Sequence, residues 1–245
     1  MRSGDHGSIF EGTAKLEITI TSCLQINQGR PIKHPAIPPV VLTVEGLSFR
    51  YRDPKVELFA GLSIAIPPGV TLVQGGDGRG KSTLLRLLAG ALPVEAGQLQ
   101  LNGVSLKEQP DAYRRQLLWV EPRTSDFDQL TPLQYFESLR ARYAGFDATV
   151  AKQLAEGLGL EPHLNKQLFM LSTGSKRKAW LAAAFASGAS LLLLDEPFAA
   201  LDAPSIAFIK QLLQDTSAHP GRAVVIADYE APEHVVLAGL VDLGD

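Results

Sequence analysis

Several features are scarce in this 245-residue chain, and each scarcity argues against a class of protein. Its one cysteine, Cys23, excludes an internal disulfide framework and fits a reducing compartment. The net charge of -3 gives no reason to expect nucleic-acid binding. The most apolar stretch, 179–194, is interrupted by Gly188 and two serines, which favours a helix, a turn and a buried strand over a membrane span. The N-terminus also lacks the basic start and apolar core of a signal peptide. We therefore expect a soluble, cytoplasmic protein whose membrane role, if any, comes through a partner.

The first 39 residues are hard to place. Residues 16–21 alternate in polarity as a strand does, but the rest of the segment is polar and ends in a group of prolines. We interpret 1–39 as a poorly ordered extension and 40–245 as the working domain. An accessory strand is the alternative.

A glycine-rich loop carries the strongest motif. It fits the phosphate-loop pattern G-x-x-x-x-G-K-[ST], and it stands between an apolar β-type run at 70–73 and a helix-type run at 82–89. The glycines let successive backbone N–H groups point at one centre, and the following helix offers its positive end to an anion. The lysine can reach the β- and γ-phosphates, and the serine after it can bind Mg²⁺. A glycine-rich turn that matches by chance is the alternative. The loop consists of Gly75, Gly76, Asp77, Gly78, Arg79, Gly80, Lys81, Ser82 and Thr83.

Two carboxylates end a second apolar run. Residues 191–194 are four leucines, which predict a strand buried on both faces, and Asp195 and Glu196 follow directly. Ligands collect at such strand ends in open α/β sheets. We expect Asp195 to hold Mg²⁺ opposite Ser82, and Glu196 to orient or deprotonate an attacking water.

The remaining pattern predicts an α/β domain with a helical insertion at about 122–175. Apolar spacing and turn residues separate the elements. Expected strands cover 41–51, 58–66, 97–103, 117–120 and 223–227, and expected helices cover 133–143, 148–158, 171–186 and 204–214.

Taken together, these motifs resemble the nucleotide-binding domain of ATP-binding-cassette (ABC) transporters across about five-sixths of the chain. The phosphate loop resembles the Walker A motif, and 191–196 the Walker B motif with its catalytic glutamate. Residues 171–175 (LSTGS) resemble the signature motif, residues 200–202 the D-loop, and Tyr51 the residue that stacks on adenine. The resemblance implies a P-loop NTPase fold with a RecA-like core, an antiparallel β subdomain and a helical subdomain, and it implies ATP and Mg²⁺ as cofactors. For Tyr51, core packing is the alternative to stacking.

The resemblance also implies a mechanism and partners. Two cassettes, as a homodimer or a heterodimer, meet head to tail, so that Ser172 and Gly174 of one signature motif cover the ATP of the other. The resemblance also makes Asp202 of the D-loop a candidate nucleotide-binding residue. ATP closes the pair and hydrolysis reopens it, which drives a membrane-spanning permease on separate chains. The cassette would then sit at the inner face of the cell membrane.

Three positions depart from the family pattern. The glutamine expected after strand 117–120 is replaced by Glu121-Pro122, and the switch histidine expected after strand 223–227 is replaced by Asp228-Tyr229, which removes a contact to the γ-phosphate. Asp228 is the candidate nucleotide-binding residue at this position. The signature motif carries Thr173 and Ser175 where glycine and glutamine are usual. The working hypothesis is a hydrolytic ATPase that includes Lys81 and Glu196 as catalytic residues. The alternatives are an ATP-binding regulator that hydrolyses weakly, an ABC protein acting on ribosomes or DNA, and a small-molecule kinase.

Overall fold

Two β-sheets organise the part of the chain that the computed structural model describes, which is residues 40–52, 57–121, 124–216 and 221–244. The expected extension at 1–39, with its strand-like segment 16–21, lies outside these ranges, as does Pro122. The division into domains therefore stays a prediction.

The first sheet is antiparallel and contains the predicted hairpin. Strand β1 (Leu42–Arg50) pairs with β2 (Glu57–Ile66) on one side and with β4 (Ala96–Leu101) on the other, and β4 pairs with β5 (Val104–Ser105). The order is β2-β1-β4-β5. This sheet confirms the expected antiparallel β subdomain.

The second sheet is parallel and runs in the order β6-β7-β8-β3-β9. Side chains alternate along its buried strands, as the two-residue period of a strand requires. On β7, Leu191 and Leu193 belong to the core shared with the antiparallel sheet, whereas Leu192 and Leu194 belong to the core on the helical side. Because both faces are covered, all of β7 is buried, as its run of leucines predicts. The bounds are β6 Leu117–Val120, β7 Leu191–Asp195, β8 Ala223–Ala227, β3 Gly69–Gln74 and β9 Leu237–Asp242.

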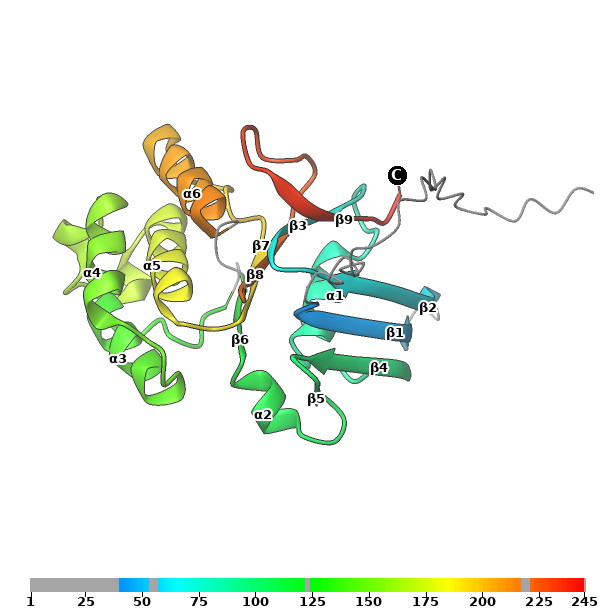
Figure 1. The fold of residues 1–245 in the computed structure, drawn as a ribbon. Helices are drawn as coiled ribbons and strands as arrows, with labels where there is room; N and C mark the ends of the chain where they lie inside the picture. The colour runs from blue at the N-terminus through cyan, green and yellow to red at the C-terminus, as the bar shows by residue number, and fades with distance from the viewer. Residues whose placement is uncertain (1–39, 53–56, 122–123, 217–220, 245) are drawn as a thin grey trace, which may run out of the picture. The chain divides into compact units, whose positions relative to one another are not determined.

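Helices cover the two faces of the parallel sheet (Figure 1). Helix α1 (Lys81–Leu88) packs on the face toward the antiparallel sheet, while α3 to α6 lie on the other side. Capping residues fix where two of these helices begin: Thr131 and Gln134 form a reciprocal capping box on α3, and Asp147 caps α4. The predicted helices are confirmed to within two residues at each end. Their bounds are α3 Pro132–Arg142, α4 Ala148–Gly157, α5 Thr173–Ala186 and α6 Ala203–Thr216, with short 3₁₀ turns at Glu161–His163 and Leu168–Met170.

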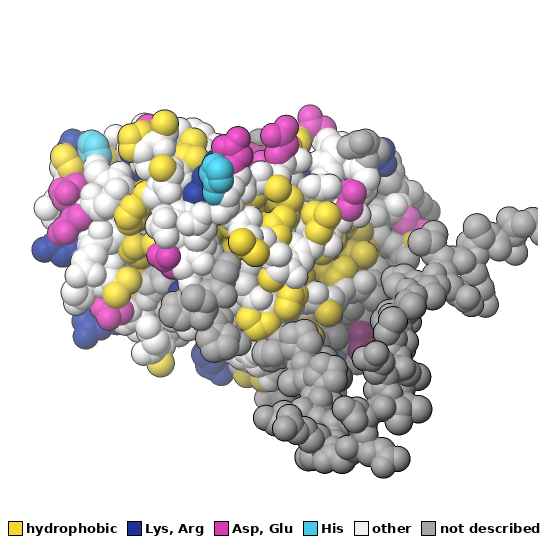
Figure 2. All heavy atoms as spheres, turned by 45° about the horizontal axis from the view of Figure 1, so that its top comes forward, with side chains coloured by type: hydrophobic (Ala, Val, Ile, Leu, Met, Phe, Trp, Pro, Cys, Tyr) yellow, Lys and Arg dark blue, Asp and Glu magenta, His cyan; other side chains and the backbone are white. Residues whose placement is uncertain are grey.

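Among the helices and strands, the sequence pattern did not predict α2 (Pro110–Arg114), the short strand β5 or β9. Strand β9 pairs with β3 and forms one edge of the parallel sheet. Leu240 of this strand is exposed, and so is Val236, which directly precedes the strand. Figure 2 shows apolar side chains gathered on the face that includes this edge. Of the helices in the described ranges, none combines the length and the apolarity that crossing a lipid bilayer requires.

Candidate functional site

The phosphate loop joins the end of β3 at Gln74 to the start of α1 at Lys81. Gly80, the residue before the helix, has a φ of 94°, a conformation that side chains strongly disfavour. A Cβ atom on Gly80 would also lie 2.6 Å from the Leu58 Cδ2 atom. Both the backbone turn and the close approach of β2 therefore require the glycine that the motif places here.

The first turn of α1 is prepared for an anion. Gly80 offers no side-chain cap, and no acidic residue occupies the first turn. The backbone N–H groups at this end thus have no side-chain acceptor, and the helix dipole adds positive potential there. A phosphate group satisfies both conditions, so the loop fits the phosphate chain of ATP.

Lys81 is held in place by the loop itself. Its side chain is buried, and its Nζ atom donates hydrogen bonds to the carbonyl oxygens of Gly75 at 2.6 Å and Gly76 at 3.1 Å. The same Nζ atom lies 4.0 Å from the centre of the Tyr229 ring, and the Tyr229 hydroxyl donates to the carboxylate of Asp77. Tyr229 therefore lies across the loop and contacts the lysine that phosphates are expected to bind.

The predicted acids come together because their strands are neighbours. Strand β7 pairs with β8, and β8 with β3, so their carboxyl ends meet beside the phosphate loop. The Glu196 N–H donates to the Ala227 carbonyl at 2.9 Å, and the Asp228 N–H donates to the Val73 carbonyl at 3.1 Å. The structure thus places Asp195, Glu196 and Asp228 at one edge of the sheet.

The acidic side chains at this edge of the sheet lie close together and are partly buried, and this changes their pKa values. Burial raises the pKa of Asp195 above its ordinary value, and a hydrogen bond from the Ser82 hydroxyl opposes that rise. Burial also raises the pKa of Asp228, with the charge of Glu196 adding to the rise and that of Lys81 opposing it. A cation bound here would relieve the repulsion between these carboxylates.

The oxygen atoms available at this edge suit Mg²⁺, and they do not form a complete coordination shell made by protein alone. Within the described ranges, no group of three or more histidine, cysteine or acidic side chains is placed to hold a metal ion. The Ser82 hydroxyl and the Asp195 carboxylate lie within hydrogen-bond distance of each other and would offer two hard oxygen ligands. Mg²⁺ usually takes one or two protein oxygens and completes its shell with phosphate oxygens and water.

Tyr51 is anchored at the nucleotide end of α1. Its hydroxyl hydrogen-bonds the Thr83 hydroxyl at 2.8 Å, and its ring meets Phe49 edge to face at 5.0 Å. The residue is 39% exposed, so Tyr51 is not enclosed in the core. This placement suits stacking on a base better than packing in the core.

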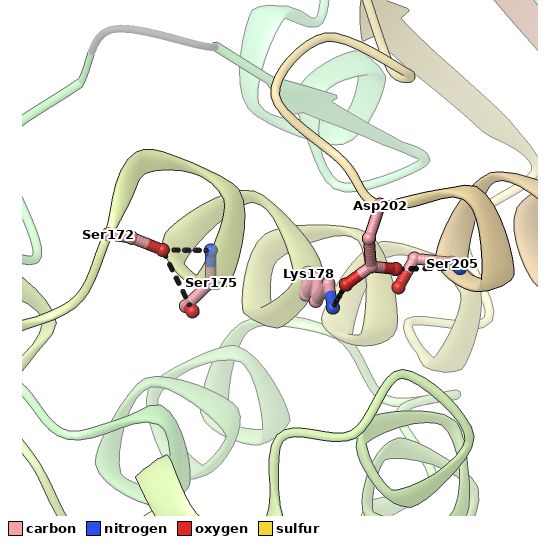
Figure 3. A network of polar contacts seen from close by, with 5 residues as sticks. All are labelled: Ser172, Ser175, Lys178, Asp202 and Ser205. Atoms are coloured by element: carbon pink, nitrogen blue, oxygen red, sulfur yellow. Dashed lines mark hydrogen bonds and ion pairs between the residues drawn. The ribbon is translucent and has the colours of Figure 1, made fainter.

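The signature motif begins α5. The Ser172 hydroxyl caps the helix by accepting from the Ser175 N–H at 3.1 Å, as Figure 3 shows. Gly174 lies against the D-loop, because a Cβ atom there would be 2.3 Å from the Ala200 carbonyl oxygen. The signature motif and the D-loop are therefore in backbone contact within one chain.

Asp202 is engaged inside its own chain. One carboxylate oxygen accepts from the Ser205 N–H at 2.9 Å, at the start of α6, and the other pairs with Lys178 Nζ of α5 at 2.7 Å (Figure 3). The bond from Lys178, together with those from Ser205, holds the pKa of Asp202 well below its usual range. This contact also joins α5 to the D-loop.

Three contacts near the site were missed by the sequence patterns. Arg177 of α5 donates to the carbonyls of Glu196, at 3.0 Å, and Ala199. Glu121, at the place where the family has glutamine, forms an ion pair with Arg86 at 3.2 Å. The contact of Tyr229 with Lys81 is the third. No signal in the sequence pointed to Arg177, because it stands between Lys176 and Lys178 at the polar start of α5 and only the structure shows that it is buried.

Comparisons with known proteins agree with this geometry. The family model described as "ABC transporter" matches residues 59–199. The chain is 35% identical over 181 residues to the cytochrome c biogenesis ATP-binding export protein CcmA of Aromatoleum aromaticum, covering 71% of this chain and 83% of that protein.

Solved structures show the same fold. An ATP-binding subunit of an ABC transporter superimposes with a TM-score of 0.69 at 23% identity, covering 77% of this chain and 79% of that one. The dimeric structure of MJ0796, a bacterial ABC transporter cassette, gives 0.67 at 22% identity, covering 77% and 88%. By its phosphate loop, its paired strand-end acids, its signature motif and these matches, the chain belongs to the ABC transporter family as an ATP-binding subunit.

Proposed function

We propose that this cassette hydrolyses ATP and thereby powers a separate membrane-spanning permease. The observation that carries the proposal is that Lys81 and Ser82, which follow β3, and Asp195 and Glu196, at the end of β7, meet at the carboxyl edge of the parallel sheet, on either side of β8. Each has the chemistry that phosphoryl transfer to water requires there.

Each residue has a distinct task in this proposal. Lys81 and the N-terminus of α1 bind the phosphates, and Tyr51 stacks on the adenine. Ser82 and Asp195 would hold Mg²⁺, which when bound neutralises charge on the phosphate oxygens. Glu196 orients the attacking water and accepts its proton. When nucleotide binds, Lys81 exchanges the carbonyls of Gly75 and Gly76 for phosphate oxygens.

A second cassette is part of the proposal. Ser172 and Gly174 open α5, so the signature motif can present a further helix N-terminus to phosphate. In the family arrangement that phosphate belongs to the other cassette, and the solved MJ0796 cassette is dimeric. We expect the working unit to be a dimer, with ATP between the Walker motifs of one chain and the signature motif of the other.

The membrane role rests on relatives. The CcmA relative is named as an export protein, and the described part of this chain contains no helix suited to crossing a bilayer. We infer a permease on separate chains that holds the cassette at the inner face of the cell membrane. The inference predicts that the cassette sediments with membranes of its own host and is released when the permease is deleted.

Two substitutions separate binding from hydrolysis. Lys81→Ala should lose ATP binding, whereas Glu196→Gln should keep it and stop phosphate release. Glu230→Gln is the matched control, because Glu230 is an exposed acid shortly after β8. Unchanged phosphate release by Glu196→Gln would refute the hydrolytic role of this residue.

A second candidate is an ATP-dependent switch that hydrolyses slowly. The contact of Tyr229 with Lys81 favours it, because an aromatic ring lies where the family has a histidine at the phosphates. The ion pair of Glu121 with Arg86 favours it as well, because it engages the carboxylate at the glutamine position. Stoichiometric ATP binding without phosphate release in a single-turnover assay would select this candidate.

A further inference from the structure

Arg177 is a buried cation between the signature motif and the Walker B acids. Its side chain is 5% exposed, and one guanidinium nitrogen donates to the carbonyl oxygens of both Glu196 and Ala199. The Nε atom is buried and has no hydrogen-bond partner among the described residues. Burial lowers the pKa of this guanidinium, and the charges of Glu196, Asp195 and Asp228 oppose that effect. Burying an arginine is costly unless its donors are paired, so the two carbonyls that accept from Arg177 are part of what keeps it in this position.

The carbonyls that Arg177 binds enclose an unusual turn. Glu196 has a φ of 45° and Ala200 a φ of 60°, both in the left-handed region that residues other than glycine seldom adopt. Such strain persists only where the surroundings hold it, and it gathers at functional sites. Here the Ala199 N–H donates to the Glu196 carbonyl at 3.2 Å, and Arg177 joins both ends of the same turn.

We propose that Arg177 is a positioning residue for hydrolysis, which fixes the direction of the Glu196 side chain through its backbone carbonyl. The inference rests on the proposed function, in which Glu196 handles the attacking water. Within the described ranges, the hydrogen bonds of Arg177 go to the segment that follows β7 and not to the phosphate loop. It holds the turn so that the glutamate carboxylate points to one place.

The same residue connects two nucleotide sites. In the proposed dimer, the start of α5 contacts the ATP of the second cassette, whereas Glu196 serves the ATP of its own chain. Arg177 lies two residues after the signature motif, within the second turn of α5, and donates a hydrogen bond to the Glu196 carbonyl. Two further contacts hold α5 to the same segment. Gly174 lies against the Ala200 carbonyl, and Lys178 forms an ion pair with Asp202, which Figure 3 shows. Arg177 therefore links occupancy of one site to the geometry of the acid in the other.

The chain offers a matched control in Arg222. Its guanidinium also donates to two backbone carbonyls, those of Phe185 and Ala184, both at 3.1 Å, and its Nε atom is likewise buried without a partner in the described ranges. Arg222, however, binds the far end of α5, away from the acids. Lysine or methionine at either position removes a similar set of bonds, but only the change at 177 releases Glu196.

The experiment measures ATP turnover and melting temperature for the full chain and its variants Arg177→Lys, Arg177→Met, Arg222→Lys and Arg222→Met. We expect both lysine variants to lose similar thermal stability. Arg177→Lys should lower kcat roughly ten- to a hundredfold with KM for ATP nearly unchanged, because a misplacement of about 1 Å has such an effect. Arg177→Met should lower it further, and the Arg222 variants should keep kcat.

The outcomes distinguish the two proposals. If Glu196→Gln abolishes turnover but Arg177→Lys keeps the kcat of Arg222→Lys, the positioning role is wrong and the proposed function stands. If Glu196→Gln retains turnover, the proposed function fails first. Should either methionine variant fail to fold, the two lysine variants decide the question alone. A loss of kcat shared equally by Arg177→Lys and Arg222→Lys would also overturn the proposal, because it would show a purely structural effect.

Discussion

The contact between the signature motif and the D-loop gives a prediction whose size can be worked from the structure. In Gly174→Ala, the new Cβ atom would lie 2.3 Å from the Ala200 carbonyl oxygen, whereas real Cβ contacts are essentially never under 3.0 Å. The start of α5 and the D-loop must therefore separate by at least 0.7 Å. The obstacle is backbone, so no side-chain rotation can relieve it.

Two opposing effects set the net loss of stability. Overpacking of this kind costs about 1–3 kcal/mol. Alanine is the better helix former by up to about 1 kcal/mol, which offsets part of that cost. We expect a net loss of about 1–2 kcal/mol, which for a chain of this size lowers the melting temperature by roughly 2–8 °C. Turnover should also fall, because Glu196 and Asp202 belong to the segment that is displaced.

Thermal unfolding of Gly174→Ala beside Gly221→Ala tests this reasoning. A Cβ atom added to Gly221 would meet no atom of the described residues within 4 Å, and this glycine has no left-handed φ, so its change to alanine should leave stability equal or slightly higher. A Gly174→Ala protein that melts at or above the temperature of Gly221→Ala, with full turnover, would refute the claimed contact.

Three further predictions concern the nucleotide site and its support. Tyr51→Ala should weaken ATP binding by about 1–3 kcal/mol, whereas Tyr51→Phe should bind ATP nearly as the wild type does, because stacking needs the ring and not the hydroxyl. Titration calorimetry measures the affinity of each variant, and equal affinities of Tyr51→Ala and the wild type would contradict stacking. Tyr113→Phe should lower the free energy of unfolding in urea by about 1–3 kcal/mol, since the buried hydroxyl donates to the Leu88 carbonyl at 2.7 Å; an unchanged value would argue against that bond. Asp228→Asn should be more stable than wild type at neutral pH. Burial raises the pKa of Asp228 in the folded protein, so the wild type loses stability as the pH rises from about 4 through that pKa. The difference in unfolding free energy between Asp228→Asn and the wild type should therefore vanish below about pH 4, and a difference that grows in acid would contradict this reasoning.

The phosphate loop and the paired acids could be predicted because their determinants are local. The glycines of the phosphate loop, Lys81 and Ser82 lie within one short stretch of sequence. The four leucines and the two acids that follow them also form one short stretch. Strand β9 escaped prediction because Ala238 and Gly239 interrupt its apolar pattern. Gly239 is needed for packing, since a Cβ atom there would lie 2.9 Å from the Thr71 hydroxyl oxygen.

The missed contacts are long-range, and no local pattern encodes them. The hydroxyl of Tyr229 meets Asp77 across 152 residues of sequence, and only the pairing of β8 with β3 brings them together. Arg177 reaches Glu196 because α5 packs against the end of β7, which helical periodicity alone does not state. The sequence shows that the histidine position has changed, but not that a tyrosine there lies over the lysine of the loop.

The most direct test of the central claim is ATP turnover by the purified protein at rising protein concentration, beside Glu196→Gln. The account predicts that specific activity of the wild type rises with concentration, because two cassettes complete each site, and that Glu196→Gln binds ATP without turnover. Turnover that is strictly proportional to protein concentration, or that persists in Glu196→Gln, would contradict it.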